Sequence, residues 1–244
     1  MSGATDLPEF HQRVDRLSGS QLAALEVVLA ALERPVTTSA FEESDLASPT
    51  FVDAFAVRLR LHHASSAEPF AKDKFEHATK LALLMDGRDA ELAPRGNPGH
   101  DLTVGGERWS LKTQADSAIK HDVIHISKFM ELGKGKWEDE GDLALLRDRM
   151  LLHLGGYERI FTLRCLSASR LIGHANGFEY ELVEIPKALL ARAQSGIISM
   201  RWESSQNPKP GTCVVSEGED VLFELYFDGV ASAEVVYERP ADGR

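Results

Sequence analysis

The stretch that decides the fold is Gly99-His-Asp-Leu-Thr-Val-Gly-Gly-Glu-Arg-Trp-Ser-Leu-Lys-Thr-Gln114. Its apolar residues alternate with polar ones on both sides of the Gly105-Gly106 pair. Alternation of this kind is typical of half-buried strands, and two consecutive glycines favour a tight turn because glycine readily adopts a positive φ. We therefore predict a hairpin from about residue 100 to 113, with Asp101 on its first strand and Lys112 on its second.

Asp101 and Lys112 are predicted to point to one side of this hairpin, near a common point, because side chains alternate along a strand. A carboxylate can hold a hard divalent cation, and a nearby ammonium can orient or activate water. The pair is thus the minimal equipment for phosphodiester hydrolysis. On spacing alone the alternatives are at least as good, since Asp101 could cap a turn and Lys112 could be a solvated strand residue.

The composition is that of a globular protein whose 244 residues, 43% hydrophobic and 27% charged, suffice for one large α/β domain or two small ones. No apolar run is long enough to predict a membrane span, and the N-terminus lacks the features of a secretory signal. Two cysteines, Cys165 and Cys213, are too few for a disulfide framework or a zinc site. We expect buried, reduced thiols in a cytoplasmic protein without membrane contacts.

The net charge of −11 argues against a protein that coats DNA without specificity. Positive charge is nevertheless concentrated between residues 95 and 136, which hold seven basic and five acidic residues. An acidic exterior around a basic groove is compatible with a site-specific DNA enzyme, because phosphate binding depends on the field inside the groove.

The remaining patterns predict an α/β fold with a mixed central sheet flanked by helices. Helices are expected over residues 18–34, 51–61, 69–85, 139–154 and 186–193. Strands are expected over residues 123–126, 158–166, 178–185, 221–227 and 234–238, and near residue 214. We divide the chain into an N-terminal helical extension, residues 1–50, and a core with DNA-recognition loops, residues 51–244, within one compact domain.

Several blocks of this sequence, in order along residues 51–228, resemble the SmaI family of type II restriction endonucleases, in the PD-(D/E)XK nuclease superfamily. The blocks around the hairpin are Asn97-Pro-Gly-His-Asp-Leu102, Leu111-Lys-Thr113, His125-Ile-Ser-Lys128 and Met130-Glu-Leu-Gly-Lys-Gly135. Others are Phe75-Glu-His-Ala78, Tyr157-Glu-Arg-Ile-Phe-Thr-Leu-Arg164, Leu182-Val-Glu-Ile-Pro-Lys187, Pro208-Lys-Pro-Gly211 and Leu225-Tyr-Phe-Asp-Gly229. The resemblance implies a restriction-endonuclease-like fold and Mg²⁺-dependent cleavage of double-stranded DNA at a short GC-rich palindrome, with CCCGGG and a blunt cut as the expectation.

The resemblance also guides the choice of metal ligands. The superfamily usually has a second carboxylate two positions before the lysine, where this chain has Ser110. Glu76, in the matching block of the 69–85 helix, is the substitute that the resemblance favours. We expect Asp101, Glu76 and the main-chain carbonyl of Leu111 to hold Mg²⁺, while Lys112 acts on the attacking water.

Glu76 and its competitors have plainer interpretations as well. Without the family, Glu76 is best explained as one half of an ion pair with Lys72 or Lys80, four residues away on the same helix. Glu107 is an alternative acid, but it lies close to the turn.

Residues expected to contact DNA are Asn97, His100, Gln114, His125, Lys128, Lys134, Lys136 and Lys209. Residues 133–137 are predicted to form a basic, glycine-rich tip and residues 207–211 a stiff loop, and both are candidates for contact with DNA. Each could instead be an ordinary solvated loop or turn. Gln114 could hold a water or contact a phosphate, and it replaces an acidic residue that the resemblance leads us to expect. His121 and His125 would make a zinc pair only in a helix, and their segment is predicted to be extended.

A palindromic target implies a two-fold homodimer with one active site for each strand. A restriction role implies a cognate DNA methyltransferase as a functional partner. Two rival interpretations remain open at this point. One is a DNA-binding protein that kept the nuclease fold and lost catalysis, which Ser110 suggests; the other is a structure-specific repair nuclease.

Overall fold

The computed structural model describes residues 6–94, 96–97, 99–115, 119–131, 137–166, 177–228 and 232–238. The chain forms two compact units, Met1–Leu92 and Ala93–Arg244. Within the described ranges, no helix is both long and apolar enough to cross a lipid bilayer. The predicted boundary near residue 50 falls inside the first unit, in the first turn of its third helix, and the separate character of residues 1–50 stays a prediction.

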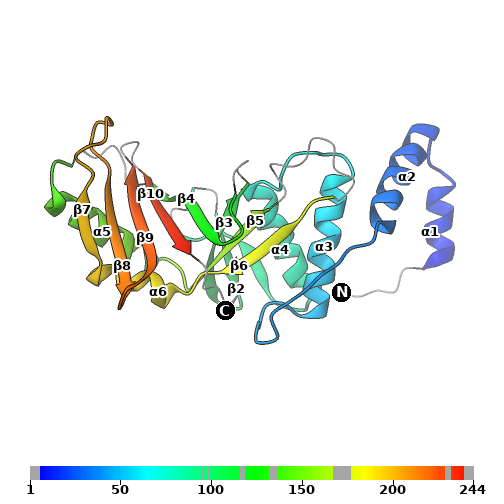
Figure 1. The fold of residues 1–244 in the computed structure, drawn as a ribbon. Coiled ribbons are helices and arrows are strands. Elements are labelled where there is room, and N and C mark those ends of the chain that lie inside the picture. Colours follow the sequence, from blue (N-terminus) through cyan, green and yellow to red (C-terminus); the bar gives the residue numbers. More distant parts are fainter. Residues whose placement is uncertain are drawn as a thin grey trace. The chain divides into compact units, whose positions relative to one another are not determined.

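Over its described residues, 6–92, the first unit has four helices and one short strand. They are labelled in Figure 1. In chain order these are α1 (Leu7–Val14), α2 (Gly19–Glu33), α3 (Pro49–His63), α4 (Lys72–Met85) and β1 (Ala90–Leu92). The three predicted helices are confirmed as α2, α3 and α4. Helix α1 and strand β1 were not predicted, because eight and three residues are too short to establish a period.

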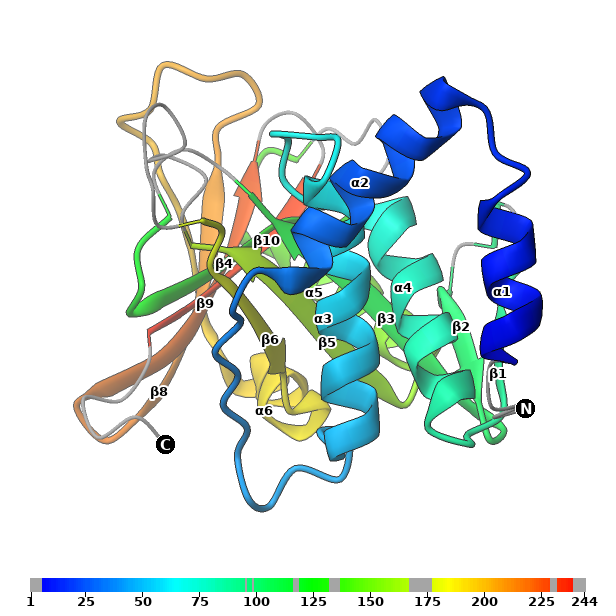
Figure 2. The same cartoon turned by 90° about the vertical axis from the view of Figure 1, so that its right-hand side faces the viewer.

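Helices α3 and α4 lie side by side and supply the aromatic core of this unit (Figure 2). Phe51 stacks on Phe55 with ring centroids 5.8 Å apart, and Phe55 meets Phe75 edge-on at 6.0 Å. Ser48 caps α3 by accepting a hydrogen bond from the Phe51 amide at 3.0 Å. The cap satisfies a donor that the first helical turn leaves unpaired and so fixes where α3 begins.

The second unit contains the predicted hairpin within a mixed sheet. Its strands β2 (Leu102–Val104), β3 (Glu107–Gln114), β5 (Arg159–Cys165) and β6 (Tyr180–Glu184) lie in that order. The pairings are antiparallel for β2 with β3, parallel for β3 with β5, and antiparallel for β5 with β6. Gly105 and Gly106 make the turn with φ of +55° and +92°, values that glycine adopts without strain. The hairpin and the mixed sheet are both confirmed.

The other strands of this unit form a second sheet, antiparallel throughout, in the order β4-β10-β9-β8-β7. Their bounds are β4 (Val123–Glu131), β7 (Ile197–Met200), β8 (Gly211–Glu217), β9 (Asp220–Asp228) and β10 (Ser232–Glu238). Strand β4 is longer than the predicted 123–126, because pairing with β10 carries it through the polar Ser127. Strand β7 was missed, since four residues give little alternation to detect.

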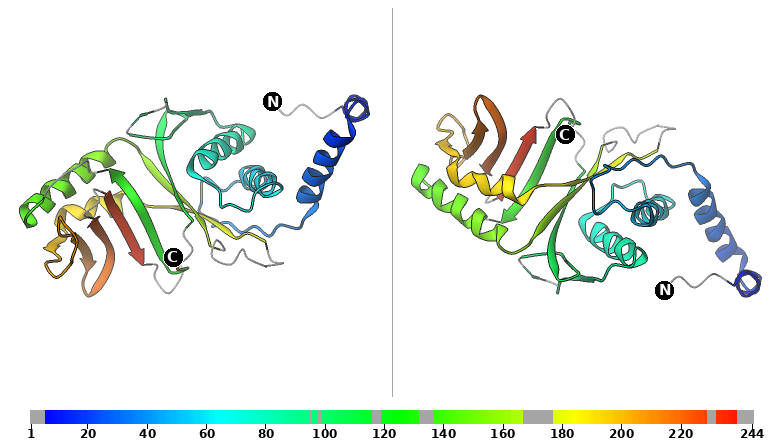
Figure 3. Two further views of the ribbon diagram at one scale, coloured as in Figure 1. Left: turned by 90° about the horizontal axis from the view of Figure 1, so that it is seen from above. Right: turned by 90° about the horizontal axis from the view of Figure 1, so that it is seen from below.

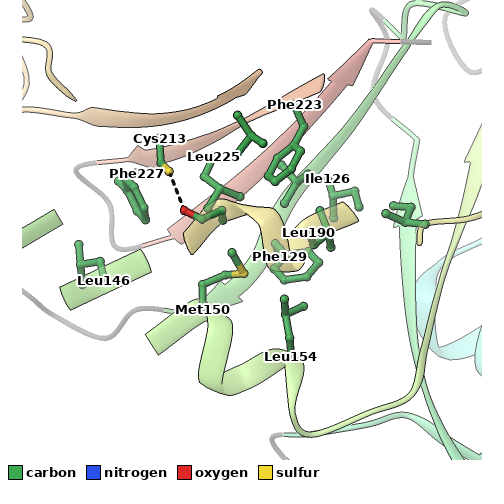
Figure 4. Packing of buried hydrophobic residues seen from close by; sticks show 14 of the residues in the cluster. Ile126, Phe129, Leu146, Met150, Leu154, Leu190, Cys213, Phe223, Leu225 and Phe227 are labelled. Atoms are coloured by element: carbon green, nitrogen blue, oxygen red, sulfur yellow. Dashed lines mark hydrogen bonds between the residues drawn. The ribbon is translucent and has the colours of Figure 1, made fainter. Parts of the chain in front are cut away.

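Helices α5 (Glu140–Leu154) and α6 (Lys187–Ala191), with a 3₁₀ turn η2 (Arg192–Ser195), lie along this second sheet (Figure 3). The apolar stripe of α5 meets the inward side chains of β8 and β9 (Figure 4). Fully buried side chains in this core include Leu143, Met150, Phe223, Leu225 and Phe227. Cys213 lies among them and donates to the Ala193 carbonyl at 3.5 Å, so both cysteines are buried thiols, as expected.

Candidate nuclease active site

Asp101 is fixed across the hairpin by its neighbours on β3. Its Oδ2 accepts a hydrogen bond from the Leu111 amide at 2.6 Å and a longer one from the Ser110 hydroxyl at 3.4 Å. Its own amide donates to the Trp109 carbonyl at 2.8 Å. Ser110, which stands where the superfamily usually has a second carboxylate, therefore serves here as a hydrogen-bond donor to the first one.

Lys112 shares the side of the sheet that Asp101 occupies. It lies two residues beyond Ser110 on β3, and side chains with this spacing point to the same face. Its Nζ lies 5.8 Å from the ring centroid of Phe129, on β4. The ring confines the ammonium to the space above it, so the lysine is steered by packing as well as by charge.

His153, in the last turn of α5, is influenced by both of these charges. Burial lowers the pKa of His153, the positive charge of Lys112 lowers it further, and the negative charge of Asp101 raises it. The carboxylate and the ammonium therefore both lie near one imidazole. Sequence reasoning missed His153; its position three residues after the buried Met150 on the apolar stripe of α5 was the available signal.

Tyr157 completes the wall of this site and was not predicted either. Its ring packs edge-on against His153 at 5.3 Å, and His153 meets Phe129 at 6.3 Å. Burial, and then the charge of Asp101, raise the pKa of the Tyr157 phenol. Its hydroxyl is buried without a hydrogen-bond partner among the described residues, as is the hydroxyl of Thr162, which lies opposite Lys112 on β5.

The donors at this site suit a hard cation, because Asp101 offers carboxylate oxygen and Leu111 a main-chain carbonyl. Across the described ranges, no three His, Cys, Asp or Glu side chains come together as a metal site. The donor chemistry fits Mg²⁺, with the protein supplying few charged ligands.

Glu76 lies on α4, in the first unit, and is partly buried with 22% of its side chain exposed. Its Oε1 lies 3.5 Å from the Lys72 Nζ, which is the ion pair of the plainer interpretation. Its role as the second acid stays a prediction.

Gln114 lies at the end of β3 in a buried hydrogen-bond network. Its Oε1 accepts from Nε of Arg164, a side chain with no exposed surface, at 2.9 Å. Arg164 also donates to Glu181 Oε2 at 2.6 Å and to the Val123 carbonyl at 2.7 Å, and to the carbonyls of Lys120 and His121. Only 6% of Gln114 is exposed, and the interaction seen for its side chain is the hydrogen bond with Arg164. A contact of Gln114 with DNA stays a prediction.

Asn97 and His100 form a small network before Asp101. The Asn97 Nδ2 lies 2.9 Å from the His100 Nδ1, and the His100 Nε2 lies 3.2 Å from the Thr103 hydroxyl. His125 lies on β4 opposite Val236, so its segment is a strand and not the helix that a zinc pair with His121 would need. The DNA contacts expected of these residues stay predictions.

Lys209 lies in the loop between β7 and β8. Its carbonyl accepts a hydrogen bond from the indole Nε1 of the buried Trp137 at 2.6 Å. Trp137, the described residue of the predicted 133–137 segment, is therefore bonded to the 207–211 segment. Lys134, Lys136 and the side chain of Lys128 lie outside the described residues.

The mixed α/β fold, with Asp101 just before β2 and Lys112 on β3, is consistent with the restriction-endonuclease-like class of nucleases. The chain belongs to the SmaI family of type II site-specific deoxyribonucleases, which it matches over residues 11–238. It is 44% identical over 193 residues to the type II restriction enzyme SmaI of Serratia marcescens, covering 78% of this chain and 74% of that protein. No solved structure matches the chain. The protein is thus a DNA-cleaving hydrolase.

Proposed function

We propose that this protein is a Mg²⁺-dependent restriction endonuclease that acts as a homodimer and cuts CCCGGG in duplex DNA at its centre, leaving blunt ends. The observation that carries this proposal is the placement of Asp101 and Lys112 on one side of the β2-β3-β5 sheet, where Asp101 accepts from the Leu111 amide and the Lys112 ammonium lies over the Phe129 ring. Similarity to SmaI supports the restriction role, and the family resemblance is the basis for the target sequence.

Asp101 and the Leu111 carbonyl, joined by Glu76, would hold the metal ion. When bound, Mg²⁺ supplies positive charge to the scissile phosphate and makes the attacking water more acidic. The hydrogen bond from the Leu111 amide keeps the Asp101 carboxylate in one orientation before DNA arrives. Such preorganisation removes part of the ordering cost from the reaction itself.

Lys112 orients the attacking water and offsets the negative charge that grows on the phosphate during displacement. Phe129 limits where its ammonium can lie, because the ring closes one side of the space around Nζ. Asn97, His100, Gln114, His125, Lys128, Lys134, Lys136 and Lys209 are proposed as DNA contacts. The protein would act in the cytoplasm, beside a methyltransferase that protects the same sequence in the host DNA.

A digest of plasmid DNA tests the proposal directly. Purified protein with Mg²⁺ should give discrete fragments whose sequenced ends are blunt and fall at the centre of CCCGGG, and a chelator should stop the reaction. Discrete fragments with ends at another sequence would show that the proposed target is wrong and that the protein is still a site-specific endonuclease. A complete lack of discrete fragments, with intact folded protein, would remove the proposed activity.

Sedimentation of the purified protein tests the dimer. The chain has a mass of 26.9 kDa, and the species at working concentration should have twice that mass. A stable monomer that cuts both strands of the target would contradict the two-fold arrangement.

A further inference from the structure

One of the three tryptophans in this chain is displayed to solvent. Trp109 and Trp137 are 2% and 3% exposed, whereas Trp202 is 56% exposed. Burying an indole stabilises a fold more than burying almost any other side chain, so leaving one in water forgoes that stabilisation. The exposure of Trp202 therefore needs an explanation outside the folding of the chain.

The loop that carries Trp202, residues 201–210, joins β7 to β8 (Figure 1). Hydrogen bonds within the loop fix its conformation. The Arg201 amide donates to the Pro210 carbonyl at 2.9 Å, and the Ser204 amide donates to the Arg201 carbonyl at 3.1 Å. The Lys209 ammonium donates to the Ser204 carbonyl across the loop. The exposed indole of Trp202 therefore lies on a loop whose conformation is fixed by hydrogen bonds.

The base of the loop is fixed to the helical layer of the unit. A Cβ placed on Gly211 would lie 2.1 Å from a methyl carbon of Leu143, so the chain passes against α5 at a distance that only glycine permits. The bond from Trp137 to the Lys209 carbonyl holds the same end of the loop, two residues before Gly211. That bond also joins it to the segment whose sequence carries Lys134 and Lys136.

The exposed side chains of the loop match the chemistry of duplex DNA. Gln206 and Asn207 are exposed carboxamides, each able to donate to and accept from a base edge. The loop carries two basic residues, Arg201 and Lys209, and one acid, Glu203, and the Arg201 guanidinium also pairs with Glu224 on β9 at 2.9 Å. An exposed indole among such groups can stack on a base or wedge between base steps.

We propose that the 201–210 loop is a base-contacting element of this nuclease and that Trp202 is a specificity-determining residue, its indole lying against bases of the target duplex. The proposal rests on the proposed function and adds to it the part of the chain that reads the sequence. From the sequence, Lys209 was predicted as a DNA contact and residues 207–211 as a candidate groove loop, but Trp202 was not singled out.

Quenching of tryptophan fluorescence by acrylamide reports on Trp202, because the other two indoles are shielded. The experiment uses Lys112→Met protein and a duplex carrying the cleavage site mapped from wild-type fragment ends. Adding this duplex should reduce quenching to the level of the Trp202→Phe variant. Unchanged quenching with the duplex bound overturns the proposal, as does protection that grows with protein concentration without DNA, which would place Trp202 between copies of the chain.

Binding affinity provides the second measurement. Trp202→Ala in the Lys112→Met protein should raise the Kd for the site duplex by about tenfold to a hundredfold, the loss expected for one base–aromatic stack. It should also narrow the difference in Kd between this duplex and one with a single altered base pair. Trp202→Phe keeps a stacking ring and should retain most of the affinity, which separates loss of the ring from loss of the fold.

Ile197→Ala is the matched control, because Ile197 is a 74% exposed apolar residue at the start of β7, the strand that leads into the same loop. It should leave Kd and specificity unchanged. If Trp202→Ala binds the site duplex with unchanged affinity and specificity, the inference is wrong. If the wild-type protein still cleaves DNA in that case, the proposed function is unaffected. If the wild type itself fails to cut DNA, it is the proposed function that fails.

Discussion

Asp101 and Lys112 can be tested with substitutions that keep the hairpin intact. Asp101→Asn retains an oxygen to accept the Leu111 amide, so the strand pairing should survive while the negative charge is lost. Lys112→Met keeps the length of the stem over Phe129 and removes the ammonium. Each change should lower the cleavage rate by at least about 10²-fold, in the range of a lost acid–base group, with little effect on thermal stability.

Glu107→Gln is the control for this prediction. Glu107 is the competing acid near the turn, and its carboxylate accepts from the Trp109 indole at 3.3 Å, a bond that glutamine can also accept. Its cleavage rate should equal that of the wild type. If Glu107→Gln lowers the cleavage rate as much as Asp101→Asn does, Glu107 is an acid of the active site.

Tyr157→Phe should make the protein more stable. The phenol hydroxyl is buried without a partner in the described part of the chain, and removing such a group relieves an uncompensated desolvation cost of about 1–3 kcal/mol. Urea unfolding should show a higher midpoint with an unchanged slope. The same substitution at Tyr226, a partly exposed residue on β9, should not give this gain; a destabilised Tyr157→Phe protein would indicate that the hydroxyl has a partner in solution.

At the scale of elements, Arg164 is the point where four segments meet. Its guanidinium bonds to β3 through Gln114, to β6 through Glu181, and to main-chain carbonyls just before β4 and at its first residue. Arg164→Met would leave these acceptors buried and unpaired, and breaking a buried ion pair in this way costs about 3–5 kcal/mol. We expect a loss of that order in the free energy of unfolding.

Arg192→Met is the comparison for Arg164→Met. The pair of Arg192 with Glu217 is open to solvent, with 40% and 70% of the side chains exposed. Its removal should change the free energy of unfolding by at most about 1 kcal/mol. Equal losses from both variants would mean that the buried network contributes no more than a surface pair.

The elements also indicate how far the sequence reaches. Helices α2 to α5 and the hairpin could be predicted because each repeats its hydrophobic period several times or carries a glycine turn. The Asp101–Lys112 pair could be predicted because both residues belong to that hairpin. His153 and Tyr157 could not be assigned to the site, because α5 and the turn after it come to β3 and β4 only through tertiary packing, which no local pattern encodes.

Pairing between strands was beyond sequence reasoning for a related reason. The alternation in β9 and β10 shows one buried face but does not name the partner strand, so a separate antiparallel sheet could not be distinguished from an extension of the mixed one. Trp202 was overlooked because a tryptophan is highly buried on average, although its polar neighbours Arg201 and Glu203 were an available signal of exposure.

At the scale of the whole molecule, mild acid should weaken the first unit. Burial lowers the pKa of His63 from 6.5 to about 4, although its hydrogen bond to the Ser66 carbonyl acts in the opposite direction. The folded protein therefore takes up this proton less readily than the unfolded chain, whose histidine protonates near 6.5. The stability that His63 contributes is complete above that pH and is lost as pH falls towards 4.

Thermal melting between pH 7 and pH 4.5 checks this prediction. His63→Gln should lower the melting temperature at pH 7 and flatten its fall with acidity, because the replacement does not titrate. His11→Gln, at an exposed position on α1, should reproduce the wild-type curve. If the melting temperature of His63→Gln falls with pH as steeply as that of the wild type, groups other than His63 cause the loss of stability in acid.

The bond between the Trp137 indole and the Lys209 carbonyl also bears on how target preference could be re-engineered. Because the two segments are fastened to each other, neither can be transplanted alone from a relative without stranding an indole N–H or shifting the recipient's backbone. A chimaera designed to acquire a new target should exchange both stretches together. The exchanged part should include Gly211, which lets the start of β8 pass close to Leu143.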